Sequence, residues 1–478
     1  MQVTSMHFKQ RAGVKLADVP LRAALDGLQT KFVRGRAEII KELDNFEDLR
    51  EAAKRIRDRA LASLDLYLEE FERNAQARGA VVHWAETTQQ VTEIVCRLAQ
   101  TYGVRKAIKS KSMVSEECAL NEALEAAGVQ VVETDLGEYI LQLAHEAPSH
   151  IIAPVIHKQK DEVSDLFAQK HGTPRKTDIG ELTREAREIL RPHFLSADMG
   201  ISGANFLVAE TGSTLIVTNE GNGRMVTTMP RVHVAITGIE KVVPTLEDVA
   251  TLMRLLPRSA TGQSISNYVS INTGVRAPDE ADGPEHFHII LVDAGRSRLL
   301  GGELRAALRC IRCGACMNHC PVYQSIGGHA YGWVYPGPIG SILTPAYVGL
   351  ENALDLPNAS TLCNQCGVVC PVKIPLPDLL RKLREKQVER GLRPWQERLG
   401  LRVWSWTAQH PALYASLARL GVRLLRLMGD GDGMIHKLPF ASGWTGGRDF
   451  PAPEGATFRE LYAKRASKPG SGVLPPNR

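Results

Sequence analysis

The 478-residue sequence lacks the features that would place it in a membrane or outside the cell. It has no stretch of about 18 uncharged apolar residues, so no membrane-spanning helix is expected. Residues 1–15 contain neither an apolar core nor a small-residue cleavage pattern, so no secretory signal is expected. Aromatic residues make up only 6% of the chain, while hydrophobic residues (44%) and charged residues (23%) stand at the levels of ordinary globular proteins. We therefore expect a cytoplasmic protein.

A dinucleotide-binding fingerprint is also missing. Gly221-Asn222-Gly223 contains the first two glycines of such a motif. The motif must lie between a strand and a helix, whereas the residues around these glycines predict a tight hairpin. The sequence therefore does not indicate a bound nicotinamide dinucleotide as a two-electron acceptor.

Cysteine is scarce, and seven of the nine cysteines fall into two short runs. The first run has the spacing C-x2-C-x2-C-x3-C-P and consists of Cys310, Cys313, Cys316, Cys320 and Pro321. This is the bacterial ferredoxin-type signature for a [4Fe–4S] cluster, in which the fourth cysteine ligates the other cluster of a pair. The run therefore predicts a protein that carries electrons.

The second run repeats the first with one replacement. It has the spacing C-x2-C-x3-C-P, and Ser360 stands where the first cysteine would be. Because the fourth cysteine serves the other cluster, we expect crossed ligation. Cluster I would be held by Cys310, Cys313, Cys316 and Cys370, and cluster II by Cys320, Cys363 and Cys366. The fourth corner of cluster II would be Ser360, a non-protein ligand or nothing, and an empty corner would favour a [3Fe–4S] form over [4Fe–4S].

Two other uses of these cysteines are less favoured. A structural zinc ion also binds thiolates and accepts histidine, and His319 adjoins Cys320. Zinc gives no reason for the paired Cys-Pro endings, however, and disulfide bonds need an oxidising compartment. The two cysteines outside the runs, Cys96 and Cys118, are expected to be buried core thiols.

The pattern of predicted elements divides the chain into four regions. Residues 1–79 are expected to be helical, and residues 80–299 alternate between strands and helices, which predicts an α/β domain with a largely parallel sheet. Residues 300–390 contain both cysteine runs and predict a helical, ferredoxin-type dicluster domain. Residues 391–478 form a helical tail. Within the α/β domain, strands are predicted at 80–83, 107–108, 129–133, 151–154 and 286–293, and helices at 116–127 and 137–144.

The tail carries most of the positive charge. Residues 381–478 contain 18 Lys or Arg against 8 Asp or Glu, a net charge of +10, whereas the whole chain has +5. A basic amphipathic helix is predicted at 413–428, and three roles are open for it: packing on the cluster module, docking another subunit, or peripheral contact with a membrane surface. Nucleic acid is not an expected partner, because no nucleic-acid motif accompanies the charge.

Candidate substrate-site residues follow the predicted strands of the α/β domain, where open sheets of this class bind ligands. Each has an ordinary structural alternative, such as a solvated charge, a helix-dipole partner or a hydrogen-bonded histidine. The weak catalytic candidates are Lys109, Lys111, Glu133, His150, Glu210 and Glu220.

Several segments resemble one protein family. They are Thr211–Arg224, Lys109–Met113 and Glu133–Ile140, together with Gly327–Gly340 and the two cysteine runs. On these segments the chain resembles the lactate utilisation protein B family, the iron–sulfur subunits of a three-protein system. The resemblance implies a LUD domain with a sugar-isomerase or CoA-transferase-like fold in the first 300 residues. It also implies oxidation of L-lactate to pyruvate with two partner subunits, and in this family a serine occurs at the position of Ser360.

We therefore expect an oxidoreductase subunit that relays electrons while a small hydroxy acid is oxidised in the complex. Two alternatives stay open. One is the iron–sulfur subunit of another 2-hydroxy-acid oxidase of the glycolate type. The other is a non-catalytic, anion-binding scaffold in which the clusters are structural.

Overall fold

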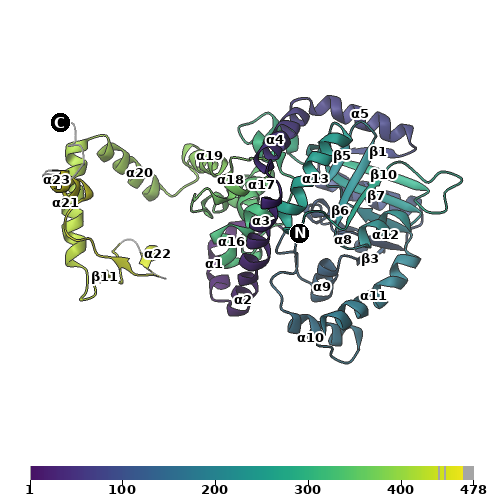
Figure 1. Ribbon diagram of the computed structural model, residues 1–478, viewed down its shortest axis with the longest axis horizontal. Coiled ribbons are helices and arrows are strands. Elements are labelled where there is room, and N and C mark those ends of the chain that lie inside the picture. The colour runs from purple at the N-terminus through teal and green to yellow at the C-terminus, as the bar shows by residue number, and fades with distance from the viewer. Residues whose placement is uncertain (1, 440–441, 446–447, 467–478) are drawn as a thin grey trace. The chain divides into compact units, whose positions relative to one another are not determined.

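The computed structural model describes residues 2–439, 442–445 and 448–466 (Figure 1). By its internal contacts the chain forms two compact units, residues 1–390 and residues 391–478. The first unit contains an α/β domain, the cysteine-bearing module (residues 300–390) and an N-terminal helical region (residues 2–79). In the described part of the chain, no helix has the length and apolar character needed to cross a bilayer.

A six-stranded parallel sheet forms the core of the α/β domain, as the alternating pattern predicted. Its strands are, in spatial order, β1 (Val81–Ala85), β10 (His286–Val292), β7 (Val232–Gly238), β4 (Met199–Ser202), β2 (Lys106–Lys109) and β3 (Gln130–Glu133). Alternate side chains of each strand point to opposite faces of the sheet, and both faces are buried by the elements packed on them. In β10, Phe287, Ile289 and Leu291 pack against α5 (Leu64–Ala77), while Ile290 and Val292 belong to the cluster on the other face.

Helices cover both faces of this sheet (Figure 1). Besides α5, the helices of this domain are α6 (Thr88–Thr101), α7 (Met113–Glu117), α8 (Leu120–Ala126), α9 (Leu136–Ala144), α10 (Lys160–His171), α11 (Ile179–Ser196), α12 (Asn222–Thr228), α13 (Leu246–Ala260) and α14 (Arg296–Leu300). The helix predicted at 116–127 is two helices, because Ala119 adopts a left-handed conformation between them.

The hairpin predicted at Gly221–Gly223 is wrong. Gly221 has a φ of −75° and precedes α12, so this segment starts a helix. The true hairpin joins β5 (Phe206–Val208) to β6 (Ser213–Thr218), and Gly212, with a φ of +67°, lies in its turn. A side chain there would meet the backbone of Ala75, so the turn needs glycine. A second sheet follows, with the order β8 (Val242–Val243), β5, β6 and β9 (Tyr268–Asn272).

The strand predicted at 151–154 is also absent. This segment forms turns between α9 and α10, and Ile151 is buried against the cysteine-bearing module rather than within a sheet. The apolar run therefore reflects contact between two parts of the fold, which periodicity alone does not distinguish from a strand.

The cysteine-bearing module consists of short helices. They are η5 (Arg305–Arg309), α15 (Ala315–Asn318), α16 (Pro321–Ile326), η6 (His329–Tyr331), α17 (Gly337–Val348), η7 (Glu351–Ala353), η8 (Leu356–Asn358), α18 (Gln365–Val369) and α19 (Leu376–Glu389). The segment that leads into the first cysteine run forms only the short 3-10 helix η5. The cysteines lie mainly at the ends of these helices, so the loops between them shape the site.

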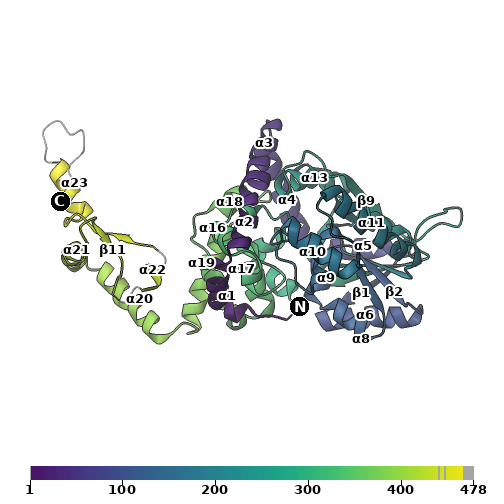
Figure 2. The same ribbon diagram turned by 90° about the horizontal axis from the view of Figure 1, so that it is seen from below.

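The N-terminal helical region packs against this module, and both views show its purple helices beside the green ones (Figures 1 and 2). Its elements are η1 (Ser5–His7), α1 (Phe8–Leu16), α2 (Val19–Leu28), the π-helix η2 (Gln29–Arg34), α3 (Gly35–Ile39), η3 (Ile40–Glu42), α4 (Phe46–Ala62) and α5 (Leu64–Ala77). Two buried or half-buried arginines fasten it to backbone carbonyls. Arg36 donates to Val369 O at 3.1 Å, and Arg50 donates to Cys370 O at 2.8 Å.

The second unit contains α20 (Trp395–Ala408), α21 (Pro411–Leu427), the strand pair β11 (Met434–Ile435) and β12 (Phe450–Pro451), α22 (Ser442–Thr445) and α23 (Phe458–Ala466). The predicted basic helix is thus present as α21. Neither α20 nor α21 buries any of its residues, and Leu420 and Leu424 are 55% and 53% exposed.

Candidate functional site

Four cysteines from both runs line a single small cavity. Cys310, Cys313, Cys316 and Cys370 surround it, and the rest of its wall is mainly apolar, including Ile151, Ile311, Ile339, Val372 and Ile374. All of these cysteines are free thiols. A cavity walled by unpaired sulfur atoms and aliphatic side chains fits a sulfur-ligated inorganic cofactor, which needs soft ligands and little water.

Burial raises the pKa values of most of these thiols. It raises the pKa of Cys313 to about 12, and the neighbouring thiols of Cys370 and Cys310 add to the effect. Burial also raises the pKa of Cys366 to about 12, and the largest thiol contribution there comes from Cys320. Metal ligation replaces these protons, so cofactor assembly must release them.

Both cysteine runs adopt the same loop conformation. In the first run, Arg312 and Gly314 flank Cys313 with φ of +59° and +71°. In the second, Leu362 and Asn364 flank Cys363 with φ of +56° and +64°. Left-handed conformations cost energy in residues other than glycine, so their repetition indicates a loop shape that serves a purpose.

Ser360 takes the place of the first cysteine in three dimensions as well as in sequence. The backbone N–H of Arg312 donates to Cys310 Sγ at 3.4 Å, and the equivalent N–H of Leu362 donates to Ser360 Oγ at 3.1 Å. The main chain around Ser360 is held by Arg384, which donates to the Ser360 carbonyl at 2.7 Å. The serine hydroxyl is therefore oriented as the missing thiol would be.

The two groups of cysteines differ in exposure. Cys310 is half-buried and the other three around the cavity are buried, whereas Cys363 is exposed. Hydrogen bonds to its sulfur, chiefly from the backbone N–H of Gln365, lower the pKa of Cys363. In the described part of the chain, no three His, Cys, Asp or Glu side chains converge tightly enough to hold a single metal ion.

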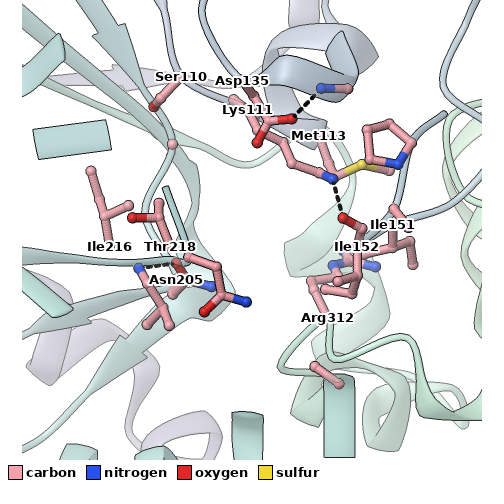
Figure 3. Close-up of a pocket in the computed structure, with 18 of the residues that line it drawn as sticks. Ser110, Lys111, Met113, Asp135, Ile151, Ile152, Asn205, Ile216, Thr218 and Arg312 are labelled. Atoms are coloured by element: carbon pink, nitrogen blue, oxygen red, sulfur yellow. Dashed lines mark hydrogen bonds between the residues drawn. The ribbon is translucent and has the colours of Figure 1, made fainter. Parts of the chain in front are cut away.

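A second, larger cavity of about 520 Å³ lies at the carboxyl ends of β2, β3, β4 and β7. This is the edge at which open parallel sheets bind ligands. Figure 3 shows Arg312 on one side of it, opposite Asn205 and Thr218, with Lys111 and Asp135 beyond. Ile151 and Arg312 line both cavities, so the larger cavity borders the four-cysteine cavity directly.

Two of the six candidates from the sequence line the larger cavity. Lys111 donates to Ile152 O at 2.8 Å and lies 3.6 Å from Glu138. Glu220 accepts from the backbone N–H of Leu136, and desolvation together with nearby Asp135 raises the pKa of Glu220 to about 7.

The other four candidates lie outside this cavity, in contacts of their own. Lys109 is fully enclosed and lies 2.6 Å from Glu133; burial opposes its charge, but this carboxylate and Glu116 raise the pKa of Lys109 to about 12. His150 forms a hydrogen bond to Asn318 at 2.8 Å, and burial lowers its pKa to about 4. Glu210 accepts from Leu246 N at 3.0 Å.

Four charged residues of the larger cavity were not among the six candidates: Asp135, Glu240, Lys241 and Arg312. Glu240 and Lys241 belong to η4 (Ile239–Lys241), which directly follows β7. Lys111 was a candidate because it follows the end of a strand. Glu240 and Lys241 follow the end of β7 in the same way, so the same criterion applies to them. Arg312 lies between the first two cysteines of the first run, and the spacing of that run makes a prediction only for the cysteines.

These residues join a buried ion network. Arg296 lies 2.9 Å from Glu117 and 2.8 Å from Glu240, and Arg312 lies 3.5 Å from Glu240. The Tyr335 hydroxyl donates to Glu117 at 2.6 Å. Burial alone would raise the pKa of Glu240, but Arg296 and the other cations lower it to about 2. The network links the α/β domain to the loops that carry the cysteines.

Comparison with known proteins agrees with this architecture. Three family models match: the LUD domain over residues 68–292, the 4Fe-4S dicluster domain over residues 306–374, and the C-terminal domain of lactate utilisation protein B over residues 380–467. A solved structure of a DUF162 family protein from Deinococcus radiodurans aligns at 14% identity over 48% of this chain and 98% of its own, with a TM-score of 0.25, too low to support a conclusion.

Curated relatives match along nearly the whole chain. Lactate utilization protein B of Bacillus licheniformis is 43% identical over 98% of this chain and 99% of its own. The proteins of that name from Macrococcus caseolyticus and Geobacillus kaustophilus are also 43% identical, over 98% and 97% of this chain and 99% and 98% of theirs. The resemblance seen in the sequence is thus confirmed, and the chain belongs to the lactate utilization protein B family.

Proposed function

We propose that this chain, an iron–sulfur subunit of lactate utilisation, relays electrons one at a time within a complex that oxidises L-lactate to pyruvate. The observation that carries the proposal is the arrangement of its two cysteine groups. One group lines a buried cavity beside the larger cavity of the α/β domain, and the other includes the exposed Cys363. Such a pair offers electrons a route from an enclosed site to the surface.

We propose crossed ligation for the two clusters. Cys310, Cys313, Cys316 and Cys370 would hold cluster I, and Cys320, Cys363 and Cys366 would hold cluster II with Ser360 at its fourth corner. The shared cavity of the first four and the matching hydrogen bonds of Cys310 and Ser360 support this division. Both clusters would be [4Fe–4S], and loss of the serine ligand would leave cluster II as [3Fe–4S]. When bound, the clusters supply one-electron redox chemistry.

The residues around cluster I would set its electrostatic environment. Arg57 and Lys241 are buried and Arg312 is partly buried, and the thiol of Cys310 contributes to the pKa of each. Buried cations stabilise added negative charge in a low-dielectric interior. Backbone N–H groups that donate to Cys310 and Cys370 act in the same direction.

We further propose a cytoplasmic complex with two other subunits. In it, residues 80–299 would form a sugar-isomerase or CoA-transferase-like domain, and residues 300–390 the electron-carrying domain. The exposed apolar side chains of α20 and α21 in residues 391–478 support a docking role for that region.

Anaerobic mixing with L-lactate tests the proposal. Cluster absorbance should bleach when L-lactate meets the reconstituted complex and stay unchanged when it meets the isolated chain. Bleaching in neither preparation would favour structural clusters, and bleaching of the chain alone would place the whole oxidation on this subunit. Faster bleaching by glycolate than by L-lactate would assign a different hydroxy acid.

A further inference from the structure

We propose that the larger cavity binds a small 2-hydroxy or 2-oxo carboxylate, whose carboxylate oxygens are held by Lys241 Nζ and Arg312 Nη1 beside cluster I. The choice of acid rests on the proposed function. The site itself rests on two buried cationic donors that line the same cavity.

Among the described residues, Lys241 Nζ forms no hydrogen bond or salt bridge. The residue as a whole is only 5% exposed. An ammonium group in such surroundings is costly unless an acceptor is supplied. Because the side chain lines the cavity, that acceptor can come from a ligand.

Arg312 carries a second unsatisfied donor. Its Nη2 lies 3.5 Å from Glu240, and its guanidinium stacks 4.4 Å from the centre of the Tyr335 ring. Its Nη1 is enclosed and has no hydrogen-bond partner among the described residues. Buried donors are almost always paired in native proteins, so an orphan donor here indicates a missing acceptor. Two such donors match the two oxygens of a carboxylate.

The charge balance at this end of the cavity also calls for an anion. Four cations, the buried Arg57, Lys241 and Arg296 and the partly buried Arg312, face two buried carboxylates, Glu117 and Glu240. Among the residues that the structure describes, the hydrogen bonds of Arg57 all go to backbone carbonyls, including Val242 O at 2.8 Å and Leu308 O at 3.1 Å. Cationic side chains therefore outnumber carboxylates at this end of the cavity.

The opposite wall suits the remainder of a short hydroxy acid. Ile216, Ile236 and Leu256 supply apolar surface for its alkyl group. Asn205 and Thr218, which Figure 3 shows across the cavity from Arg312, supply polar groups for its hydroxyl or keto oxygen. A neutral ligand would leave both cationic donors unpaired, and we therefore expect binding to depend on the carboxylate.

The cluster itself is the competing partner for these donors, because the thiolate of Cys310 lies near enough to influence both side chains. In that case Lys241 would adjust the cluster and would not bind a ligand. The two roles differ in one measurable respect: only a ligand-binding role makes the affinity for free carboxylates depend on Lys241.

The test uses the full chain loaded with iron and sulfide under anaerobic conditions, titrated calorimetrically with L-lactate, pyruvate and neutral lactamide. We expect both acids to bind, and lactamide to bind at least about tenfold more weakly. Lys241→Met should weaken acid binding by about tenfold to a hundredfold, the effect of losing a hydrogen bond to a charged group. Lys241→Arg should retain most of it.

Lys106→Met is the matched control. Lys106 lies at the other end of β2, outside the cavity, and donates to Ser196 at 2.8 Å. Its removal should leave acid binding unchanged. Iron and sulfide contents of each variant show whether the clusters survive the substitution, and the lactate–lactamide comparison on the unmodified chain does not depend on any variant folding.

Equal binding of lactate and lactamide, or acid binding unaltered in Lys241→Met, would overturn the inference. A change confined to the cluster potential in Lys241→Met would assign the lysine to the cluster alone. Failure of any acid to bind, while L-lactate still bleaches the reconstituted complex, would refute this site and leave the proposed function intact. Acid binding without bleaching of the complex would support this site and refute the proposed function.

Discussion

Arg296 is the central residue of the buried ion network, and its replacement should destabilise the first unit strongly. The side chain is completely enclosed. Its guanidinium donates to Glu117 at 2.9 and 3.1 Å and to Glu240 at 2.8 Å. Arg296→Met would keep much of the volume but leave both carboxylates without their main cation.

Removing one partner of a buried ion pair costs about 3–5 kcal/mol, because the other charge is left uncompensated. Here each carboxylate keeps one contact. Tyr335 still donates to Glu117, and Arg312 still lies 3.5 Å from Glu240. We therefore expect a loss of about 3 kcal/mol, a large part of the about 5–15 kcal/mol that stabilises a typical domain.

Urea denaturation of the iron-loaded protein, followed by circular dichroism, measures this loss, and hydrogen exchange of α7 and α14 shows whether it is local. Arg305→Met is the control, because Arg305 is exposed on η5. The double variant Arg296→Met, Glu117→Gln should recover part of the stability, since it removes one orphaned charge. If Arg296→Met changes the unfolding free energy no more than the control, about 0.5 kcal/mol or less, the reasoning on this network is wrong.

Three further predictions concern other parts of the chain. Ser360→Cys should convert cluster II to a fully thiolate-ligated [4Fe–4S] centre with an altered spin-resonance signal, and an unchanged spectrum would argue against ligation at this position. Because the pKa of Glu220 is raised to about 7, its stabilising contribution is present below its ordinary value of 4.5 and is lost as the pH rises through 7. Glu220→Gln should therefore flatten the dependence of melting temperature on pH across that window. The effect should be small, because Glu220 is exposed and solvent screens its charge. A pH profile identical to that of the unmodified protein would contradict the raised pKa of Glu220. Deletion of residues 391–478 should leave the iron content unchanged and abolish co-purification of partner subunits, because α20 and α21 expose their apolar side chains; full retention of partners would favour packing of this region on its own chain.

Much of the fold could be predicted because its signals are local. The strands at β1, β2, β3 and β10 are short apolar runs between helical patterns, and both cysteine runs have fixed spacings. The errors arose where the local sequence does not show which distant segment a residue contacts or which backbone conformation it takes. Ile151 is buried by the cysteine-bearing module, so an apolar run there looked like a strand. Gly221-Asn222-Gly223 has the composition of a hairpin turn, yet its first residue takes a helical conformation ahead of α12.

The candidate site was predicted only in part for the same reason. Lys111 and Glu220 follow or precede recognisable elements and do line the cavity. Lys109 occupies an equally suggestive position, but it ends β2 and points into an ion pair with Glu133. Lys241 and Arg312 meet only after the cysteine-bearing module packs on the sheet, and no local pattern records that contact.

The fastening of the N-terminal helical region has a consequence for biogenesis. Arg36 donates to the carbonyl of Val369 and Arg50 to the carbonyl of Cys370, which is the last cysteine of the second run. Residues 36 and 50 are synthesised long before residues 369 and 370, to which these arginines bond. Leu21, Leu25 and Leu28, buried in the finished fold, must therefore wait uncovered while the rest of the chain is synthesised. Cys370 is made only at the end of that interval, so we expect cluster I to be completed after residue 370 has been synthesised.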